Sequence, residues 1–213
     1  MQVVYATEKP PAQFTKSIFL AGPSPRNPDQ PNWRPEALAA LEAMGYDGVV
    51  FVPLPREGDW SHGYDAQVEW ELTYLNMADV VLFWVPRSKD LPAMTTNVEF
   101  GSFYDTGKAI LGYPKEATQM RYLDHLAKTE SVTVCGTLED TLRAAVTRLG
   151  TGALRVGGER DVPLHIWKLQ HFQGWFKAQK AAGNRLDGAR LLWSFRVGPA
   201  KGFTFAFVLR VDV

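Results

Sequence analysis

The sequence predicts an α/β fold: a doubly wound, five-stranded parallel sheet with helices on both faces, followed by a short C-terminal helix and a β-hairpin extension. Short, continuous apolar segments alternate with longer segments of helical periodicity as far as about residue 150. Continuous apolar strands are typical of parallel sheets that are covered on both faces. Gly and Pro residues mark the loops between the segments, as the ends of such elements require.

Five segments are predicted to be strands, because each is a short apolar run that ends at Gly or Pro. They are residues 17–22, 47–55, 79–86, 108–114 and 131–136. A further short apolar piece lies within residues 1–16 and is followed by the pair Pro10–Pro11. Because proline is confined to edge positions of sheets, we expect this piece to be a leader or an edge element.

The intervening segments are predicted to be helices. They are residues 33–46, 66–78, 97–107, 119–130 and 137–150. In the second, we expect Val68, Leu72 and Leu75 to form the apolar stripe. The last helix is the best marked, since Thr137 begins a Thr-x-x-Asp capping pattern and Gly150 ends it.

The chain is predicted to divide into three parts. Residues 1–152 form the α/β domain, and residues 153–163 form a linker that is rich in Gly and charged residues. Residues 164–213 are aromatic-rich, with a helical segment followed by two strand-like runs. Because a lone hairpin is marginally stable in water, we interpret this part as the beginning of a second domain that the chain does not complete.

Composition narrows the classes of function. Of the 213 residues, 23 are Lys or Arg and 23 are Asp or Glu, so the formal net charge is zero. The balance argues against a nucleic-acid polymer or an anionic membrane surface as partner. No apolar run reaches the ~18 residues that span a bilayer, and the N-terminus lacks a signal-peptide pattern, so we expect a cytoplasmic protein.

Metal, disulfide and standard phosphate-loop chemistry find little support. Cys135 is the only cysteine, which excludes an intrachain disulfide, and the four histidines lack the spacing of metal ligands. The chain contains no GxxxxGK[ST], GxGxxG or GxSxG motif. We therefore expect neither a metal nor another cofactor.

The topology itself predicts where a ligand would bind. In parallel sheets, ligands bind beyond the carboxyl ends of the strands, where the loops here begin at Gly22, Pro53 and Pro86. Trp33 and Trp60 lie in or beside these loops, and either ring could stack on a base. In the segment "AGPSPR", Ser24 and Arg26 could hold an anion, although the segment is also consistent with an ordinary proline-stiffened turn.

Three carboxylates flank the third predicted strand. Glu69 and Glu71 precede it, and because they are two residues apart on a helix, at most one can face the site. Glu99 follows it among small and apolar residues. We expect Glu99 near the start of a helix, where the dipole would keep it ionised; a capping role there is the alternative to chemistry.

The order of three segments resembles the nucleoside 2-deoxyribosyltransferase family and its nucleotide N-glycosidase relatives. The segments are "IFLAGPSPR", "ELTYLNMADVVLFWVP" and "TTNVEFGSFYDTGKAILGYP", and the resemblance covers roughly residues 17–150. It implies a doubly wound α/β fold, assembly as homodimers or larger homo-oligomers, and cleavage of the N-glycosidic bond of a (deoxy)nucleoside or nucleotide.

The resemblance also implies residue roles. Glu99 matches the family's nucleophile, which attacks C1′ of the sugar, and Glu71, with Glu69 as alternative, matches the acid that holds or protonates the leaving base. Ala93 stands where some members carry Asp or Ser, and neither of those functions is available to it. The residues matched to substrate contacts are Phe19, Gly22, Ser24, Arg26 and Asn97, with Trp33 and Trp60 as stacking candidates. Phe19 is equally consistent with a core position.

Two other functions remain open at this point. The same fold could bind a nucleotide without catalysis, as a sensor domain, which the departure at Ala93 favours. It could also cleave NAD at its glycosidic bond. The segment after residue 160 faintly resembles the opening of a Nudix-type hydrolase domain, but the chain contains no Nudix box, so that activity is not assigned.

Overall fold

The computed structural model of the chain describes residues 1–25, 30–58, 61–152, 160–161, 190–197 and 203–210. Two compact units are distinguished, Met1–Leu154 and Arg155–Val213. Each is described by itself.

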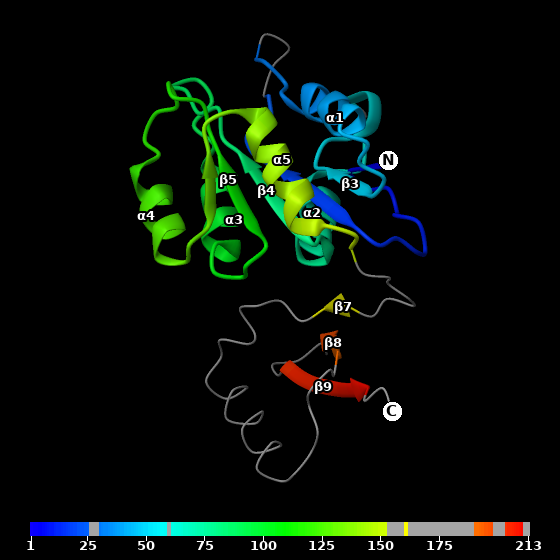
Figure 1. Cartoon of the computed structure of the whole chain (residues 1–213). Helices are drawn as coiled ribbons and strands as arrows, with labels where there is room; N and C mark the ends of the chain where they lie inside the picture. The colour runs from blue at the N-terminus through cyan, green and yellow to red at the C-terminus, as the bar shows by residue number, and fades with distance from the viewer. Residues whose placement is uncertain (26–29, 59–60, 153–159, 162–189, 198–202, 211–213) are drawn as a thin grey trace. The chain divides into compact units, whose positions relative to one another are not determined.

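A six-stranded parallel sheet forms the centre of the first unit (Figure 1). In sheet order its strands are β1 (Gln2–Tyr5), β3 (Val49–Val52), β2 (Ser17–Ala21), β4 (Val80–Trp84), β5 (Ala109–Gly112) and β6 (Thr133–Cys135). The predicted fold class is confirmed, but the strand number of five is wrong. The sixth strand is β1, whose residues pair with β3 from Gln2–Val49 to Tyr5–Val52 and so occupy the edge of the sheet.

The strand order reverses between β2 and β4. The chain leaves β2 to form β3 on one side and then returns to form β4 on the other. From β2 to β6 this is the order of flavodoxin-like doubly wound sheets, in which ligands bind outside the carboxyl ends of the two strands at the reversal. The loops that follow β2 and β4 are therefore the ones that the topology favours for a site.

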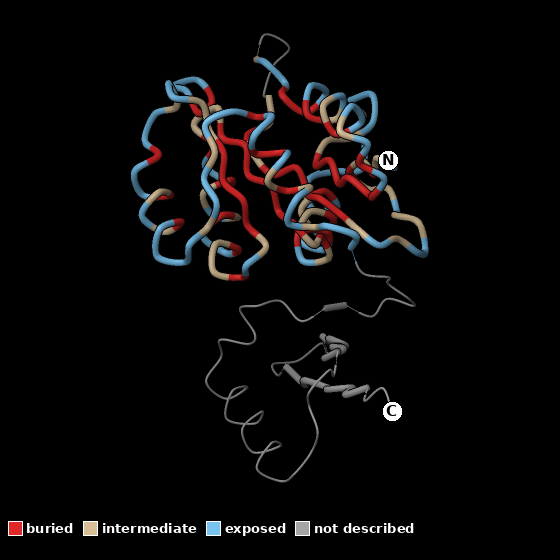
Figure 2. Tube along the Cα trace, viewed as in Figure 1, coloured by how far each residue is buried: buried red, intermediate tan, exposed pale blue. Residues whose placement is uncertain are grey.

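Five helices cover the two faces of the sheet. α1 (Arg34–Ala43) and α5 (Leu138–Leu149) pack on one face, while α2 (Tyr64–Met77), α3 (Met94–Phe103) and α4 (Arg121–Thr129) pack on the other (Figure 1). A 3₁₀ turn, η1 (Arg56–Gly58), follows β3. The four inner strands, β2 to β5, are buried along their whole length (Figure 2), as expected when both faces are covered, whereas the edge strands β1 and β6 are partly exposed.

Local signals explain how α5 is positioned. The hydroxyl of Thr137 accepts a hydrogen bond from the Asp140 amide at 3.1 Å, so the predicted cap is confirmed. At its closest approach to the sheet, α5 places the Thr141 side chain against Gly112. A Cβ atom on Gly112 would lie 2.0 Å from the Thr141 hydroxyl, so only glycine allows this contact.

The buried side of α2 differs from the predicted stripe. The buried side chains are Gln67, Trp70, Tyr74 and Leu75, whereas Leu72 is 56% exposed. Of the predicted stripe of Val68, Leu72 and Leu75, Leu75 is buried as expected, Val68 is partly buried, and the expectation for Leu72 is wrong. The aromatic rings of Trp70 and Tyr74 pack on Phe51 of β3, and this packing sets the rotation of the helix.

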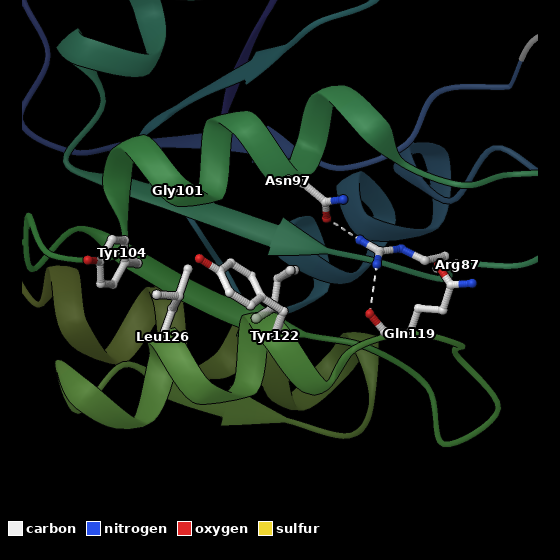
Figure 3. A pocket seen from close by; sticks show the side chains of 8 residues that line it. Arg87, Asn97, Gly101, Tyr104, Gln119, Tyr122 and Leu126 are labelled. Atoms are coloured by element: carbon white, nitrogen blue, oxygen red, sulfur yellow. Dashed lines mark hydrogen bonds between the residues drawn. The ribbon is translucent and has the colours of Figure 1, made fainter.

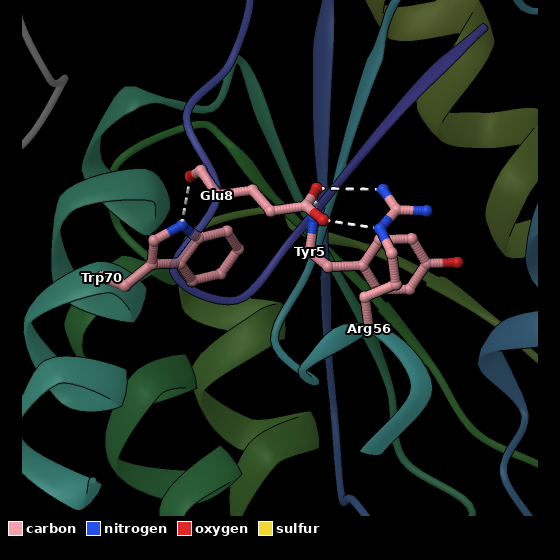
Figure 4. A network of polar contacts seen from close by, with 4 residues as sticks. All are labelled: Tyr5, Glu8, Arg56 and Trp70. Carbon is pink, nitrogen blue, oxygen red and sulfur yellow. Dashed lines mark hydrogen bonds and ion pairs between the residues drawn. The ribbon is translucent and has the colours of Figure 1, made fainter. Parts of the chain in front are cut away.

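The segment after β1 is fastened by a polar network (Figure 4). Arg56 donates from Nε and Nη2 to the two carboxylate oxygens of Glu8, at 2.6 and 3.0 Å, and its guanidinium lies 4.3 Å from the centre of the Tyr5 ring. The indole nitrogen of Trp70 donates to the Glu8 carbonyl at 2.8 Å. These contacts connect the N-terminal segment to α2 and to the loop after β3.

The second unit contains an antiparallel sheet in the order β7 (Arg160–Asp161), β8 (Arg190–Val197) and β9 (Phe203–Arg210). β8 and β9 pair along their whole length, in agreement with the predicted hairpin. The helix predicted before it falls outside the described residues. In the part of the chain that the structure describes, no helix has the length and apolar character needed to cross a membrane.

Candidate functional site

The turn after β2 lies directly against the end of β4. Gly22 has φ = +149°, and a Cβ atom at this position would lie 2.2 Å from the Trp84 carbonyl oxygen and 3.0 Å from the Trp33 ring. Glycine is therefore required for the turn to pass this close to the neighbouring strand. The approach brings the loops after β2 and β4 together at the point where the strand order reverses.

A buried arginine holds this turn. Arg34, at the first position of α1, is 1% exposed and donates to the carbonyl oxygens of Leu20 (3.2 Å), Gly22 (2.8 Å) and Pro23 (3.4 Å). Its guanidinium also lies 4.8 Å from the centre of the Trp33 ring. Arg34 thus fixes the carbonyl oxygens of the turn and places a positive charge beneath the carboxyl edge of the sheet.

Glu71 reaches this edge from α2. Gln67, one turn earlier on the helix, donates from its amide nitrogen to the Pro53 carbonyl at 3.1 Å and to the Glu71 carboxylate at 2.7 Å. Gln67 therefore positions Glu71 beside the end of β3. Glu69 is exposed, because residues two apart on a helix point roughly 200° from each other.

Glu99 lies on α3, the helix that follows β4, and its side chain is largely removed from solvent. It is the sixth residue of α3, so the expectation that it sits at the helix start is wrong: the residue before the helix is Ala93, in a left-handed conformation with φ = 55°. The stabilisation of a carboxylate by a helix N-terminus falls off within the first turn, so the dipole is not what controls its charge.

The two carboxylates and the arginine influence one another. Burial and, secondarily, the negative charge of Glu71 raise the pKa of Glu99 to about 7, and the positive charge of Arg34 opposes this rise. Burial also raises the pKa of Glu71, against the Gln67 hydrogen bond and Arg34. Burial lowers the pKa of Arg34 to about 10, against the attraction of both carboxylates. The expectation that the helix start keeps Glu99 ionised is therefore wrong, because Glu99 lies beyond the first turn and burial dominates its pKa.

The Glu71 and Glu99 carboxyl groups together could perform acid and nucleophilic chemistry. The pKa of about 7 lets Glu99 exchange a proton near neutral pH, and burial also raises the pKa of the neighbouring Glu71 above its ordinary value. Such a pair can supply both a nucleophile or electrostatic stabiliser and a proton donor. Among the described residues, no group of three His, Cys, Asp or Glu side chains could hold a metal ion.

The residues expected to contact substrate from β2 and the turn after it differ in how far they are buried. Phe19 is fully buried and packs against Phe51 and Trp70 in the core. Trp33 is 6% exposed, and its indole nitrogen donates to the Pro23 carbonyl at 3.2 Å. Ser24 is half-buried in the turn after β2.

Asn97 and Glu99 point to different sides of α3, because they are two positions apart on one helix. The side-chain oxygen of Asn97 accepts a hydrogen bond from Arg87, on the side of α3 that faces α4. Arg26 and Trp60 fall outside the described residues.

Arg34 is the residue of this group that sequence analysis missed. One signal was present: a cation is unfavourable in the first turn of a helix, yet Arg34 immediately precedes Pro35, which marked the helix start. An arginine at that position is therefore expected to have specific hydrogen-bond acceptors, which here are the carbonyl oxygens of the turn after β2.

Comparison with protein-family models finds a match to the family described as nucleoside 2-deoxyribosyltransferase like, over residues 15–117. The matched region begins just before β2 and ends after β5, so it contains Gly22, Arg34, Glu71 and Glu99. A search of curated proteins finds no match to the chain.

Proposed function

From the match of residues 15–117 to the model of the nucleoside 2-deoxyribosyltransferase-like family, we propose that the chain cleaves or transfers the N-glycosidic bond of a (deoxy)nucleoside or nucleotide. In this proposal Glu99 is the nucleophile and Glu71 the acid that protonates or holds the leaving base. The observation that carries it is the placement of the two carboxyl groups: Gln67 holds Glu71 beside the Pro53 carbonyl, and Glu99 lies near enough for the charge of Glu71 to raise its pKa.

The proposed reaction has two steps. As the bond between the base and C1′ breaks, positive charge develops on the sugar, and the Glu99 carboxylate stabilises this charge and then bonds to C1′. The electron pair of the broken bond leaves with the base, and a proton from Glu71 neutralises it. Water or a second base then attacks C1′, the bond between C1′ and Glu99 breaks with its electron pair returning to the carboxylate, and Glu71 takes up the proton that the attacking group loses.

A nucleophilic carboxyl group must be ionised, whereas a pKa of about 7 leaves Glu99 partly protonated at neutral pH. The positive charge on the sugar removes this conflict. Positive charge beside a carboxyl group favours its ionised form, so the pKa of Glu99 falls as the bond breaks. In the same state Glu71 retains its proton longer than an exposed carboxyl group would, since burial raises its pKa.

The turn after β2 is proposed to receive the sugar or its 5′-phosphate, with Gly22 allowing the close approach of the backbone and Ser24 supplying a hydroxyl. Arg26 stays a proposed phosphate contact, and Trp60 a proposed stacking surface. Given their burial, Trp33 and Phe19 support the turn and the sheet in this scheme, and neither stacks on a base. Asn97 is not retained as a sugar contact, because it faces α4.

The first test measures base release. The protein is incubated with a panel of deoxynucleosides and their 5′-monophosphates, and free base is quantified by chromatography. We expect Glu99→Gln to lower the rate about 10³-fold or more, because a lost covalent step typically carries several kcal/mol of barrier. Glu69→Gln is the matched control, with a rate close to the parent. A loss of only a few-fold in Glu99→Gln contradicts the covalent role.

A second test identifies which carboxylate carries the sugar. A substrate with an electron-withdrawing fluorine at C2′ destabilises the cationic transition state and allows a glycosyl-enzyme to accumulate. Peptide mass spectrometry should find the added sugar on the peptide that contains Glu99. An adduct on Glu71 would reverse the two roles, and exchange of isotopic label between two bases would distinguish transfer from hydrolysis.

Assembly and the competing activities are tested separately. We propose a homodimer or larger homo-oligomer, as the family resemblance implies, and exposed apolar side chains on α2 and α3 (Leu72, Met94 and Val98) offer surface for it. Sedimentation would measure the oligomeric state.

Two competing functions have their own readouts. Nucleotide binding without base release would favour the sensor function, and release of nicotinamide would favour NAD as substrate.

A further inference from the structure

A polar cavity lies between α3 and α4 (Figure 3), and Glu99 does not line it. It is an open pocket of about 570 Å³. Its lining side chains come from the loop after β4, from α3 and from the start of α4: Arg87, Asn97, Gly101, Tyr104, Gln119, Tyr122, Leu123 and Leu126. Glu99 is not among them, because it points to a different side of α3 from Asn97.

Arg87 is a buried cation at the polar end of this pocket. It is 6% exposed, and it donates from Nη1 to the Gln119 carbonyl at 2.9 Å and from Nη2 to the Asn97 side-chain oxygen. Its Nε is buried and has no hydrogen-bond partner. A guanidinium has five N–H groups, so Nε and one N–H on each terminal nitrogen are left to bind something else.

In the part of the chain that the structure describes, no carboxylate forms an ion pair with Arg87, unlike Lys16, Arg56 and Arg143, which pair with Asp47, Glu8 and Glu139. Burial lowers the pKa of Arg87, and no neighbouring charge among those residues opposes this. The contrast is Arg34, which is also buried but feels the charges of Glu71 and Glu99. A buried charge with neither a counterion nor a full set of hydrogen bonds is costly, so the site is suited to an incoming anion.

The remainder of the pocket is suited to a flat, apolar body. Tyr104, Tyr122, Leu123 and Leu126 line it beyond the guanidinium, and the Tyr122 ring is 70% exposed (Figure 3). Gly101 leaves space on the α3 side, since a Cβ atom there would meet nothing within 4 Å. Aromatic rings bind planar molecules by stacking.

We propose that this pocket is a second ligand site, which binds a small planar molecule with an anionic group, the phosphate or carboxylate contacting Arg87 and the ring lying against Tyr104 and Tyr122. The guanidinium geometry matches either oxyanion by paired N–H···O bonds. This site is independent of the proposed function, because none of its lining residues belongs to the Glu71–Glu99 pair.

The test uses the full chain with Glu99→Gln, so that the candidate active site does not consume a nucleotide. Four probes are titrated by calorimetry: adenosine 5′-monophosphate, adenosine, benzoate and inorganic phosphate. We expect the monophosphate, benzoate or both to bind, and the pattern separates a phosphate from a carboxylate ligand. Adenosine should bind at least about tenfold more weakly than its monophosphate, since the charge-assisted bonds to Arg87 are missing.

Two variants assign the binding to this pocket. Gly101→Leu fills the space from α3, keeps Arg87 and favours the helix; it should weaken binding of the monophosphate or benzoate at least about tenfold. Ser102→Leu adds the same side chain at the next, exposed position outside the pocket and should leave binding unchanged. Arg87→Met should also weaken binding about tenfold or more, although it removes contacts to Asn97 and Gln119 as well.

Three results overturn the proposal. They are equal binding of the bound probe by Gly101→Leu and by the chain with Gly101, measurable binding of adenosine as tight as that of its monophosphate, and no binding of the monophosphate or benzoate at millimolar concentration. None of them bears on base release by Glu99, which is measured in the parent chain.

Discussion

Glu71 and Glu99 come from different helices, α2 and α3, yet lie close enough for the negative charge of Glu71 to raise the pKa of Glu99. Arg34 opposes this effect from a third helix, α1. The three charges meet where the strand order reverses, and their balance decides which carboxyl group is ionised.

Glu99→Gln is expected to stabilise the fold at pH 8. Between its ordinary value of 4.5 and about 7, folded Glu99 holds a proton that the unfolded chain has released. The free energy of unfolding therefore falls as pH rises through this window. The variant should gain on the order of 2 kcal/mol over the parent at pH 8 and almost nothing at pH 4, by urea unfolding. Destabilisation of Glu99→Gln at pH 8 would show that folding does not raise the pKa of Glu99.

Glu71→Gln is expected to shift the titration of Glu99 toward a lower pH. The substitution removes the repulsion but keeps an amide that can accept from Gln67. In carbon-13 NMR of glutamate side chains, the Glu99 midpoint should move down from about 7 toward 4.5. Glu69→Gln, on an exposed side of the same helix, provides the control. A midpoint that stays at about 7 in Glu71→Gln would mean that burial alone controls Glu99.

Arg34→Met should destabilise the α/β unit by about 3 kcal/mol. Three carbonyl oxygens, of Leu20, Gly22 and Pro23, lose their donor, and each buried unsatisfied group costs about 1–3 kcal/mol before the turn relaxes. Denaturant unfolding measures this loss, with the exposed Arg143→Ala as reference. The Glu99 titration should move to higher pH, and a shift to lower pH would contradict the assigned role of Arg34.

Gly22→Ala should disturb the turn after β2. The new Cβ would lie 2.2 Å from the Trp84 carbonyl oxygen, so the turn must move away from β4. We expect a loss of about 1–3 kcal/mol in stability together with a rise in KM for any nucleoside substrate. Gly45→Ala is the comparison, since its Cβ would meet nothing within 4 Å although its φ is also positive. Equal effects of the two substitutions would show that the close approach is unimportant.

The Glu8–Arg56 pair should contribute little in spite of its two hydrogen bonds. The Arg56 side chain is 54% exposed, and exposed pairs couple by about 0.2–1 kcal/mol. A double-mutant cycle with Glu8→Gln and Arg56→Met should give a coupling in this range. The hydrogen bond to Arg56 lowers the pKa of Glu8, so the coupling should decrease as pH falls through that pKa. A coupling of several kcal/mol would contradict this.

Periodicity in the sequence was enough for the alternation of strands and helices, because burial on both faces leaves a continuous apolar run that does not depend on the partner strand. It also marked Glu99 as unusual among apolar neighbours, and loop positions indicated the carboxyl edge. For the N-terminal piece the sequence left a leader and an edge element as alternatives, and the edge element is confirmed, because a four-residue piece acquires its state from pairing with β3.

Other features depended on contacts between distant segments. The rotation of α2 is set by Trp70 and Tyr74 packing on Phe51, and this brings Glu71 inward, leaves Glu69 in solvent and exposes Leu72. Trp33 and Asn97 were expected at the substrate, but one is enclosed beside Arg34 and the other contacts Arg87. Side-chain direction on a helix follows its rotation against the sheet, which no local pattern specifies.

The amino-acid order alone therefore established the layered α/β architecture and one anomalous carboxylate, since both are recorded in local apolar patterning. The charge state of that carboxylate came from folding, because a pKa depends on burial and on charges that α1 and α2 bring from elsewhere in the chain.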